Sequence, residues 1–316
     1  MEKKRAIYFS NVYKKFGDNE VLKGLSFQVR EGEILSIAGH NGAGKTTTMR
    51  IIQGLLEIED GSVEVFGNDP SHEDENIRKM TGVLSDDTGL YESLTVYDNL
   101  KFFSDIYGCE EKFFQIETDS LLEKFQMLDY KHKIIKDFSM GMKKKIAIIR
   151  TIFHKPKLVL MDEPMNGLDP VSRELLYDLM KEMREELGTT FVVTTHDLDA
   201  VPKFSDSIII IKDGKSVLDR SLDSNYLNEI KEVYIGFYDY NEKYKKNIES
   251  LFSESYPNKK WRLDEEVLVI SDINDETVAA MVKDMVYRDI KICEISKKKF
   301  DLEKIYIDID RKGVAE

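Results

Sequence analysis

A glycine-rich segment near the N-terminus has the residue types and spacing that bind phosphate. Residues 39–46 fit the pattern G-x-x-x-x-G-K-[ST], and they stand between an apolar run at 34–38 and a helical pattern at 47–56. Glycines let backbone N–H groups close around phosphate oxygens, and the start of a helix adds positive potential. We expect a nucleotide here rather than a plain glycine-rich turn. The predicted contacts are Gly39, Asn41, Gly42, Ala43, Gly44, Lys45, Thr46 and Thr47.

Within this segment, Lys45 is expected to reach the β and γ phosphates, and the Thr46 hydroxyl to ligate Mg²⁺. A second pair of residues that could do chemistry, Asp162 and Glu163, directly follows the apolar run 158–161. Such a pair at the carboxyl end of a strand lies where an α/β sheet places ligand chemistry, although two helix-capping acids are the alternative. Asp162 is suited to the Mg²⁺ shell and Glu163 to polarising an attacking water as general base.

A third segment combines a capping residue with a glycine. Ser139 precedes an apolar-periodic helix, so its hydroxyl, the neighbouring N–H groups and the helix dipole can form a second anion-binding end, or only a helix cap. Gly141 allows a phosphate to approach the backbone closely. The position between the phosphate loop and the carboxylates favours the anion-binding interpretation.

These groups require a scaffold, and the pattern over residues 1–220 predicts an α/β domain with a largely parallel sheet. A helical insertion is expected at about 90–153, where strand patterns are missing. Residues 221–316 are expected to form a small α+β domain in the order β-α-β-β-α-β, with its second helix capped by Asn274 or Asp275. The strands predicted in the first domain are 34–38, 158–161, 191–195 and 208–211.

Composition limits the classes of function. A chain of 316 residues with 41% hydrophobic and 33% charged residues is long enough for about two globular domains, and a net charge of -13 gives little support to nucleic-acid binding. The basic runs 143–145 and 297–299 are interpreted as solvated faces. Cys109 and Cys293 are expected to be free thiols in the cytosol. No run approaches the length of a membrane helix and no secretory signal is present, so a membrane role would be peripheral.

Together these segments resemble the ATP-binding subunits of ABC transporters over about residues 7–220. Residues 39–46 are similar to the Walker A motif, 158–163 to Walker B and 139–142 to the family signature; 166–170 resemble the D-loop and 194–197 the switch-histidine segment. The resemblance implies that His196 donates to the γ phosphate and that Phe16 stacks on adenine. Tyr13 is the alternative for stacking, and Phe16 could instead be a core residue.

Two departures from the family pattern affect the interpretation. Asp86 stands where the family's glutamine links metal, attacking water and permease; its oxygen can still face the metal through water, with a shorter arm and an added charge. The signature carries Met140 in place of a glycine and Met142 in place of a glutamine. Met142, and a tail at 300–309, are similar to separately encoded ATPases of drug, peptide and polysaccharide exporters.

The resemblance implies a Mg²⁺-dependent ATPase that works with a separate integral-membrane permease. Two ATPase subunits, either two copies or one with a related chain, would face head to tail, with each ATP between one phosphate loop and the other signature helix. Outward transport is expected, at the inner face of the cell membrane. The alternatives are a soluble ABC protein of translation or DNA repair and, less favoured, a phosphate-loop kinase or GTPase, which would leave residues 139–142 and His196 unexplained.

Overall fold

The computed structural model describes residues 4–72, 75–222, 232–264, 266–271 and 273–298, together with Leu302 and Tyr306. Two compact units meet in the sequence between Ser221 and Leu222, and each has its own hydrophobic core. Within the described residues, no helix is both long enough and apolar enough to cross a membrane. Both cysteines are free thiols, as predicted.

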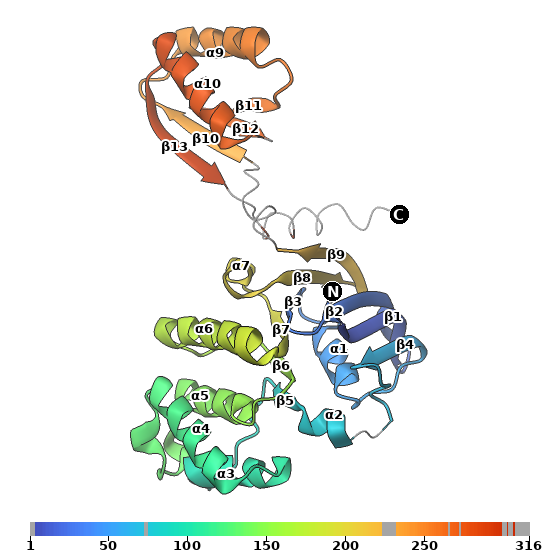
Figure 1. Cartoon of the computed structure of the whole chain (residues 1–316). Helices are drawn as coiled ribbons and strands as arrows, with labels where there is room; N and C mark the ends of the chain where they lie inside the picture. Colours follow the sequence, from blue (N-terminus) through green and yellow to red (C-terminus); the bar gives the residue numbers. More distant parts are fainter. Residues whose placement is uncertain are drawn as a thin grey trace. The chain divides into compact units, whose positions relative to one another are not determined.

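The first unit is built on a six-stranded sheet (Figure 1). Its first five strands are parallel and the sixth is antiparallel. The parallel strands are almost entirely buried because helices and a second sheet cover their faces, and the predicted α/β fold is confirmed. In spatial order they are β5 (Thr81–Leu84), β6 (Leu158–Asp162), β7 (Thr190–Thr195), β3 (Ile34–Ala38), β8 (Ser207–Lys212) and β9 (Lys215–Ser221).

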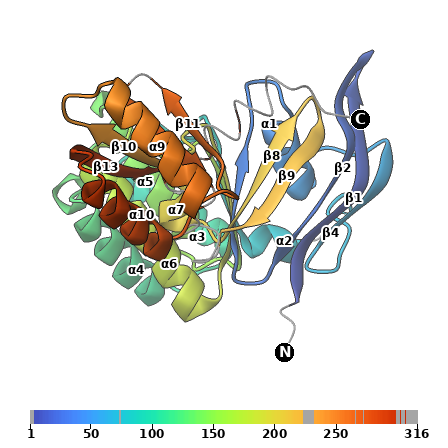
Figure 2. The ribbon, with the colours of Figure 1, turned by 90° about the horizontal axis from the view of Figure 1, so that it is seen from above.

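A second, antiparallel sheet was not predicted from the sequence. It consists of β1 (Arg5–Phe16), β2 (Asn19–Arg30) and β4 (Asp60–Val65), in the order β2-β1-β4. Figure 2 shows helix α1 (Lys45–Ile52) between this sheet and the strands β8 and β9. The prediction of a helix at 47–56 was wrong at both ends, because α1 begins two residues earlier and ends four residues earlier. Gly54 ends it with φ +68°, and a Cβ there would lie 2.0 Å from the Pro70 carbonyl oxygen.

The helical insertion is present and packs against the other face of the sheet. Its helices bury Leu100, Phe114 and Ile149 in one core with Val159 and Val193 of the strands. After the short helix α2 (Glu75–Lys79), the elements are α3 (Val96–Tyr107), α4 (Glu111–Lys124), two 3₁₀ turns (Leu128–Tyr130 and Ile135–Asp137) and α5 (Met140–Ile152). Helices α6 (Pro170–Leu187) and α7 (Val201–Phe204) follow.

The interpretation of residues 143–145 as a solvated face was wrong. Lys143 forms an ion pair with Glu92 at 2.5 Å, and Lys145 one with Asp169 at 3.0 Å. Lys144 lies between them and is only 6% exposed. The helical period places these three lysines in different directions around α5, so their environments differ.

The second unit has the predicted split-βαβ order. Four antiparallel strands in the order β11-β12-β10-β13 form its sheet, and Asn274 caps the second helix through the Thr277 N–H. Val278, Met281 and Met285 of that helix are buried, whereas Val286 is exposed. The elements are β10 (Glu232–Phe237), α9 (Glu242–Ser255), β11 (Trp261–Asp264), β12 (Val267–Ser271), α10 (Asp275–Tyr287) and β13 (Ile292–Lys298).

His154 makes the stability of the first unit depend on pH. Its ring stacks on Tyr107 with centroids 3.7 Å apart, and both ring nitrogens are buried without a hydrogen-bond partner in the described part of the chain. Burial lowers the pKa of His154 from 6.5 to about 4. The unfolded chain therefore binds a proton below pH 6.5 that the folded chain does not, so stability is lost as the pH falls.

We expect the free energy of unfolding to fall by about 2 kcal/mol between pH 7 and pH 5 through this one group. Urea titrations of the wild type and of His154→Leu at both pH values measure it. The leucine variant should lose that much less stability over the same interval. An equal loss in the two proteins would mean that His154 is not buried in its neutral form.

Candidate functional site

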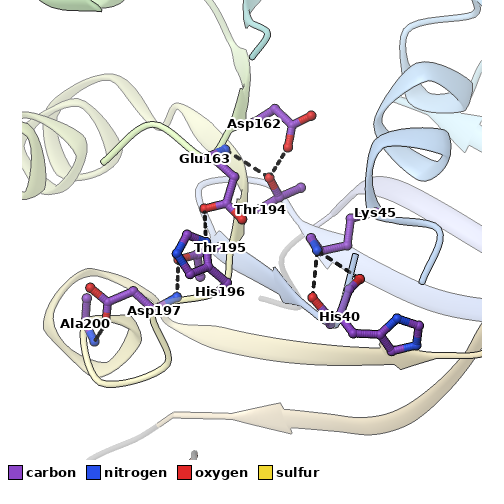
Figure 3. A network of polar contacts seen from close by, with 10 residues as sticks. His40, Lys45, Asp162, Glu163, Thr194, Thr195, His196, Asp197 and Ala200 are labelled. Carbon is purple, nitrogen blue, oxygen red and sulfur yellow. Dashed lines mark hydrogen bonds and ion pairs between the residues drawn. The ribbon is translucent and has the colours of Figure 1, made fainter. Parts of the chain in front are cut away.

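Three segments that are distant in the sequence meet at the carboxyl edge of the six-stranded sheet. The phosphate-loop segment follows β3. Asp162 is the last residue of β6 and Glu163 comes directly after it, and His196 follows β7. Strands β6 and β7 are direct neighbours, and β7 also pairs with β3. Figure 3 shows the polar groups of these segments side by side.

The loop before α1 surrounds the Lys45 ammonium with its own carbonyl groups. Lys45 is 8% exposed, and its Nζ donates to the Gly39 and His40 carbonyl oxygens at 2.6 and 3.2 Å (Figure 3). Gly44 has φ +113°, and a Cβ there would lie 2.6 Å from Leu22 Cδ2, so only glycine fits. The two hydrogen bonds from Lys45 Nζ hold the ammonium inside the loop. Thr46 is exposed and Thr47 is half-buried.

The Thr46 hydroxyl and the Asp162 carboxylate form the oxygen pair predicted for Mg²⁺. Thr46 Oγ1 donates to Asp162 Oδ2 at 3.1 Å. Hard oxygen donors suit Mg²⁺, which usually takes only one or two protein ligands and completes its shell with phosphate oxygens and water. No group of three or more His, Cys, Asp or Glu residues in the described ranges could hold a metal alone. The donor set therefore fits Mg²⁺ bound together with a nucleotide.

Thr194, at the end of β7, holds both carboxylate residues in place. Its hydroxyl donates to Asp162 Oδ1, and the Glu163 N–H donates to the Thr194 hydroxyl at 3.0 Å and lies 3.2 Å from its carbonyl oxygen. Glu163 has φ +45°, a left-handed conformation that is uncommon outside glycine and recurs at functional sites. The two carboxylates consequently point in different directions (Figure 3). Sequence reasoning gave Thr194 no role, although a polar residue ending an apolar strand was a signal.

Glu163 and His196 are in direct contact. His196 Nδ1 lies 2.9 Å from Glu163 Oε2, and because an ionised carboxylate only accepts, Nδ1 carries the hydrogen of this bond. His196 is 65% exposed in its side chain and Glu163 only 19%. To donate to a phosphate from Nε2 at the same time, His196 must be protonated on both nitrogens. The structure thus brings together the two residues predicted as base and γ-phosphate donor.

Ser139 begins α5 as the sequence predicted. Its hydroxyl accepts from the Met142 N–H at 3.3 Å, and Ser139 and Met140 are exposed to solvent. A Cβ on Gly141 would lie 2.9 Å from the Gly167 carbonyl oxygen, so this glycine is also required by packing inside the chain. Among the described contacts, none joins Ser139 or Gly141 to the phosphate loop.

Phe16 and Asp86 are two predicted residues whose side chains lie exposed at the ends of strands. Phe16 ends β1 and is 47% exposed, so it is not a core residue; Tyr13 is also exposed. Asp86 follows β5 on an exposed stretch, and within the described residues its side chain makes no hydrogen bond to Thr46 or Asp162. Both assignments stay predictions.

The ABC transporter family description matches residues 22–166 of the chain. An uncharacterized ABC transporter ATP-binding protein of Methanocaldococcus jannaschii is 40% identical over 214 residues, which cover 68% of this chain and 77% of that protein. A linearmycin resistance ATP-binding protein of Bacillus subtilis is 33% identical over 207 residues, 66% of each chain. An energy-coupling factor transporter ATP-binding protein of Methanosphaera stadtmanae is 37% identical over 215 residues, 65% of this chain and 75% of that one.

Solved structures agree with these relatives. One described as the ATP-binding subunit of an ABC transporter has a TM-score of 0.66 and 29% identity, over 69% of this chain and 90% of its own. Another, described as a dimeric post-hydrolysis state of an ATP-binding cassette bound to ADP and phosphate, has a TM-score of 0.63 and 26% identity, over 69% and 99%. The chain therefore belongs to the ATP-binding proteins of ABC transporters, and it is an ATPase.

Proposed function

We propose that this ATPase uses Mg²⁺-ATP to drive export through a separate membrane permease, at the inner face of the cell membrane. The observation that carries the catalytic part is the meeting of three groups at one sheet edge: Lys45 in its loop, Thr46 with Asp162, and Glu163 with His196. A kinase or GTPase would need neither the signature helix nor the Glu163–His196 contact.

Each of these groups has one task in the proposed reaction. Lys45 would exchange the loop carbonyls for phosphate oxygens, and Thr46 and Asp162 would hold Mg²⁺, which would supply positive charge beside the phosphates. Glu163 accepts a proton from the attacking water as general base. Its left-handed backbone fixes where the carboxylate lies, and His196 orients it through Nδ1.

The proposal includes a second ATPase subunit. The end of α5 at Ser139 offers a hydroxyl, free N–H groups and a helix dipole, but no described contact brings it to this chain's own loop. An equivalent subunit in head-to-tail orientation would supply it to the nucleotide. That a structural relative is described as dimeric supports this arrangement.

An apolar groove supports docking of a permease helix. It has a volume of about 390 Å³ and lies between the end of α1, the strand β5 and helices α2 and α3. Leu55 and Ile106, both on its walls, are exposed apolar side chains. Exposed apolar side chains around a groove mark a protein interaction site, and a short amphipathic helix of the permease is the proposed occupant.

Outward transport is supported by Met142 in the signature and by the relative named for linearmycin resistance. The energy-coupling factor relative is slightly more identical, so identity alone does not decide direction. The tail 300–309 lies outside the described residues except for Leu302 and Tyr306. ATP-dependent uptake assays in inverted vesicles that contain the whole complex measure the direction. Accumulation of substrate inside these vesicles means export. A soluble ABC protein would not copurify with any multi-spanning protein.

Replacing Ile106 with glutamate should abolish copurification with the proposed permease, since a charge would be buried in the apolar groove. ATP binding by the isolated subunit should be unchanged. Ile116→Glu is the matched control, because Ile116 is similarly exposed on α4 and does not line the groove. Equal copurification of both variants would contradict docking at this groove.

A further inference from the structure

The Phe16 ring is covered by a cation on one face and is otherwise open. The Lys14 ammonium lies over the ring, 5.3 Å from its centroid, and Phe16 is 47% exposed. A cation within about 6 Å of a ring centroid is attracted by the electrons of the ring face. The exposed part of the ring therefore remains available to a planar ligand.

The face of the antiparallel sheet that carries Phe16 also meets the phosphate loop. Lys14 of β1 pairs with Leu22 of β2, so their side chains share one face of the sheet. Phe16 stands two residues after Lys14 and lies on the same face. Leu22 is packed against the loop, since its Cδ2 would lie 2.6 Å from a Cβ on Gly44. A base attached to phosphates in the loop would thus have an aromatic ring on the sheet face beside it.

Tyr13, the alternative for stacking, belongs to the other face of β1. It stands one residue before Lys14, and successive side chains of a strand alternate between faces. Its ring packs on β2 at Gly24, where a Cβ would lie 3.0 Å from the Tyr13 hydroxyl oxygen. The geometry therefore favours Phe16 over Tyr13 as the stacking residue.

Glu59, the residue before β4, holds the segment that leads to Phe16. Its two carboxylate oxygens accept from Lys14 Nζ at 2.8 Å and from the Lys15 N–H at 2.9 Å. Its own N–H donates to the Tyr13 carbonyl oxygen at 2.9 Å. Within residues 4–72, Tyr13 is the last residue of β1 that pairs with β4. The Glu59 carboxylate consequently continues the hydrogen bonding of β1 beyond the end of the paired region.

A side chain that is held in place before a ligand arrives loses less conformational entropy on binding. We propose that Glu59 is a positioning residue for base recognition: through Lys14 it holds the Phe16 ring where the ring stacks on the adenine of bound ATP. This inference rests on the proposed nucleotide site, whose phosphate and metal contacts do not include Glu59. Glu59 thus acts on the affinity for the base and not on the phosphates.

Calorimetry with Mg²⁺-ATP and with Mg²⁺-tripolyphosphate, which lacks the base, separates the two contributions. Phe16→Ala should weaken ATP binding by about tenfold. Glu59→Ala should weaken it by about fivefold, and neither variant should change the affinity for tripolyphosphate. The double variant should bind ATP no more weakly than Phe16→Ala alone, because Glu59 acts through the ring. Lys14→Arg keeps a cation that can pair with Glu59 and cover the ring, so it should stay within about twofold of the wild type.

Glu117→Ala is the matched control, because Glu117 is a partly exposed glutamate of α4 that is paired with Lys155. It should bind both probes as the wild type does. Equal weakening of both probes by Glu59→Ala, or additive effects of Glu59→Ala and Phe16→Ala, would overturn the proposal, as would normal ATP binding by Phe16→Ala.

If Glu59→Ala does not fold, Glu59→Gln decides the matter. Glutamine keeps an acceptor for the Lys15 N–H but loses the charge that holds Lys14, so ATP binding should still weaken by about threefold with tripolyphosphate unaffected. Unchanged ATP binding by Glu59→Gln would then contradict the positioning role. If the wild type itself binds no ATP, the proposed function fails instead.

Discussion

Replacing Lys45 with alanine should abolish measurable ATP binding by the isolated subunit. Lys45 is the only lysine of the phosphate-loop motif, and its ammonium is held inside the loop by the Gly39 and His40 carbonyl oxygens. Binding a phosphate chain without it would leave several negative charges without the cation of the loop. We expect a loss of about 10² or more in affinity, since a charge-assisted contact of this kind contributes about 3 kcal/mol.

Calorimetric titration with ATP and Mg²⁺ measures this loss, and thermal unfolding shows whether the loop remains folded. Lys203→Ala is a suitable control, because Lys203 is an exposed lysine on α7 whose contact is a surface ion pair with Glu174. That variant should bind ATP as the wild type does. Near-normal turnover by Lys45→Ala would remove the phosphate-loop assignment.

The parts of the site that were predictable from sequence are those with strictly local causes. The loop at 39–46 and the acids at 162–163 follow short, mainly apolar runs, which were predicted to be buried strands and are so in the structure. Parallel pairing then brings the carboxyl ends of β3, β6 and β7 to one edge. Ser139 could be placed at a helix start because capping depends on the next three residues alone.

The parts that could not be predicted depend on packing between distant segments. The run at 143–145 looks uniformly basic in the sequence, and only the position of α5 against β5 and β6 makes Lys144 buried while its neighbours reach surface carboxylates. Thr194 acquires its role from the pairing of β7 with β6. The antiparallel sheet was missed because its long, bulged strands join residues 5–30 to residues 60–65 across the phosphate loop.

The left-handed backbone of Glu163 is the strongest structural argument for its role. Two hydrogen-bond acceptors on Thr194 hold the Glu163 N–H, while the Asp162 side chain accepts from the same hydroxyl. This arrangement keeps the general base separate from the metal ligand although the two residues are adjacent. It also means that a change confined to the Glu163 side chain leaves the backbone contacts in place.

Glu163→Gln should therefore keep ATP binding and lower hydrolysis by about 10² to 10⁴, the usual contribution of a positioned general base. The glutamine oxygen can still accept from His196 Nδ1, so shape is preserved and only the basic charge is lost. Stopped-flow phosphate release measures turnover. Glu182→Gln, which changes a surface glutamate paired with Lys124, is the control and should hydrolyse ATP normally.

The same variant tests whether the site is shared between two subunits. ATP that is bound but not hydrolysed should hold the phosphate loop of one chain against Ser139 and Gly141 of another. Purified Glu163→Gln protein should then elute as a dimer with Mg²⁺-ATP and as a monomer without it, as measured by size-exclusion chromatography with light scattering. A variant that binds ATP tightly but stays monomeric well above its dissociation constant would refute nucleotide-driven pairing of the isolated subunit, and the permease or residues 221–316 would have to bring the two halves together.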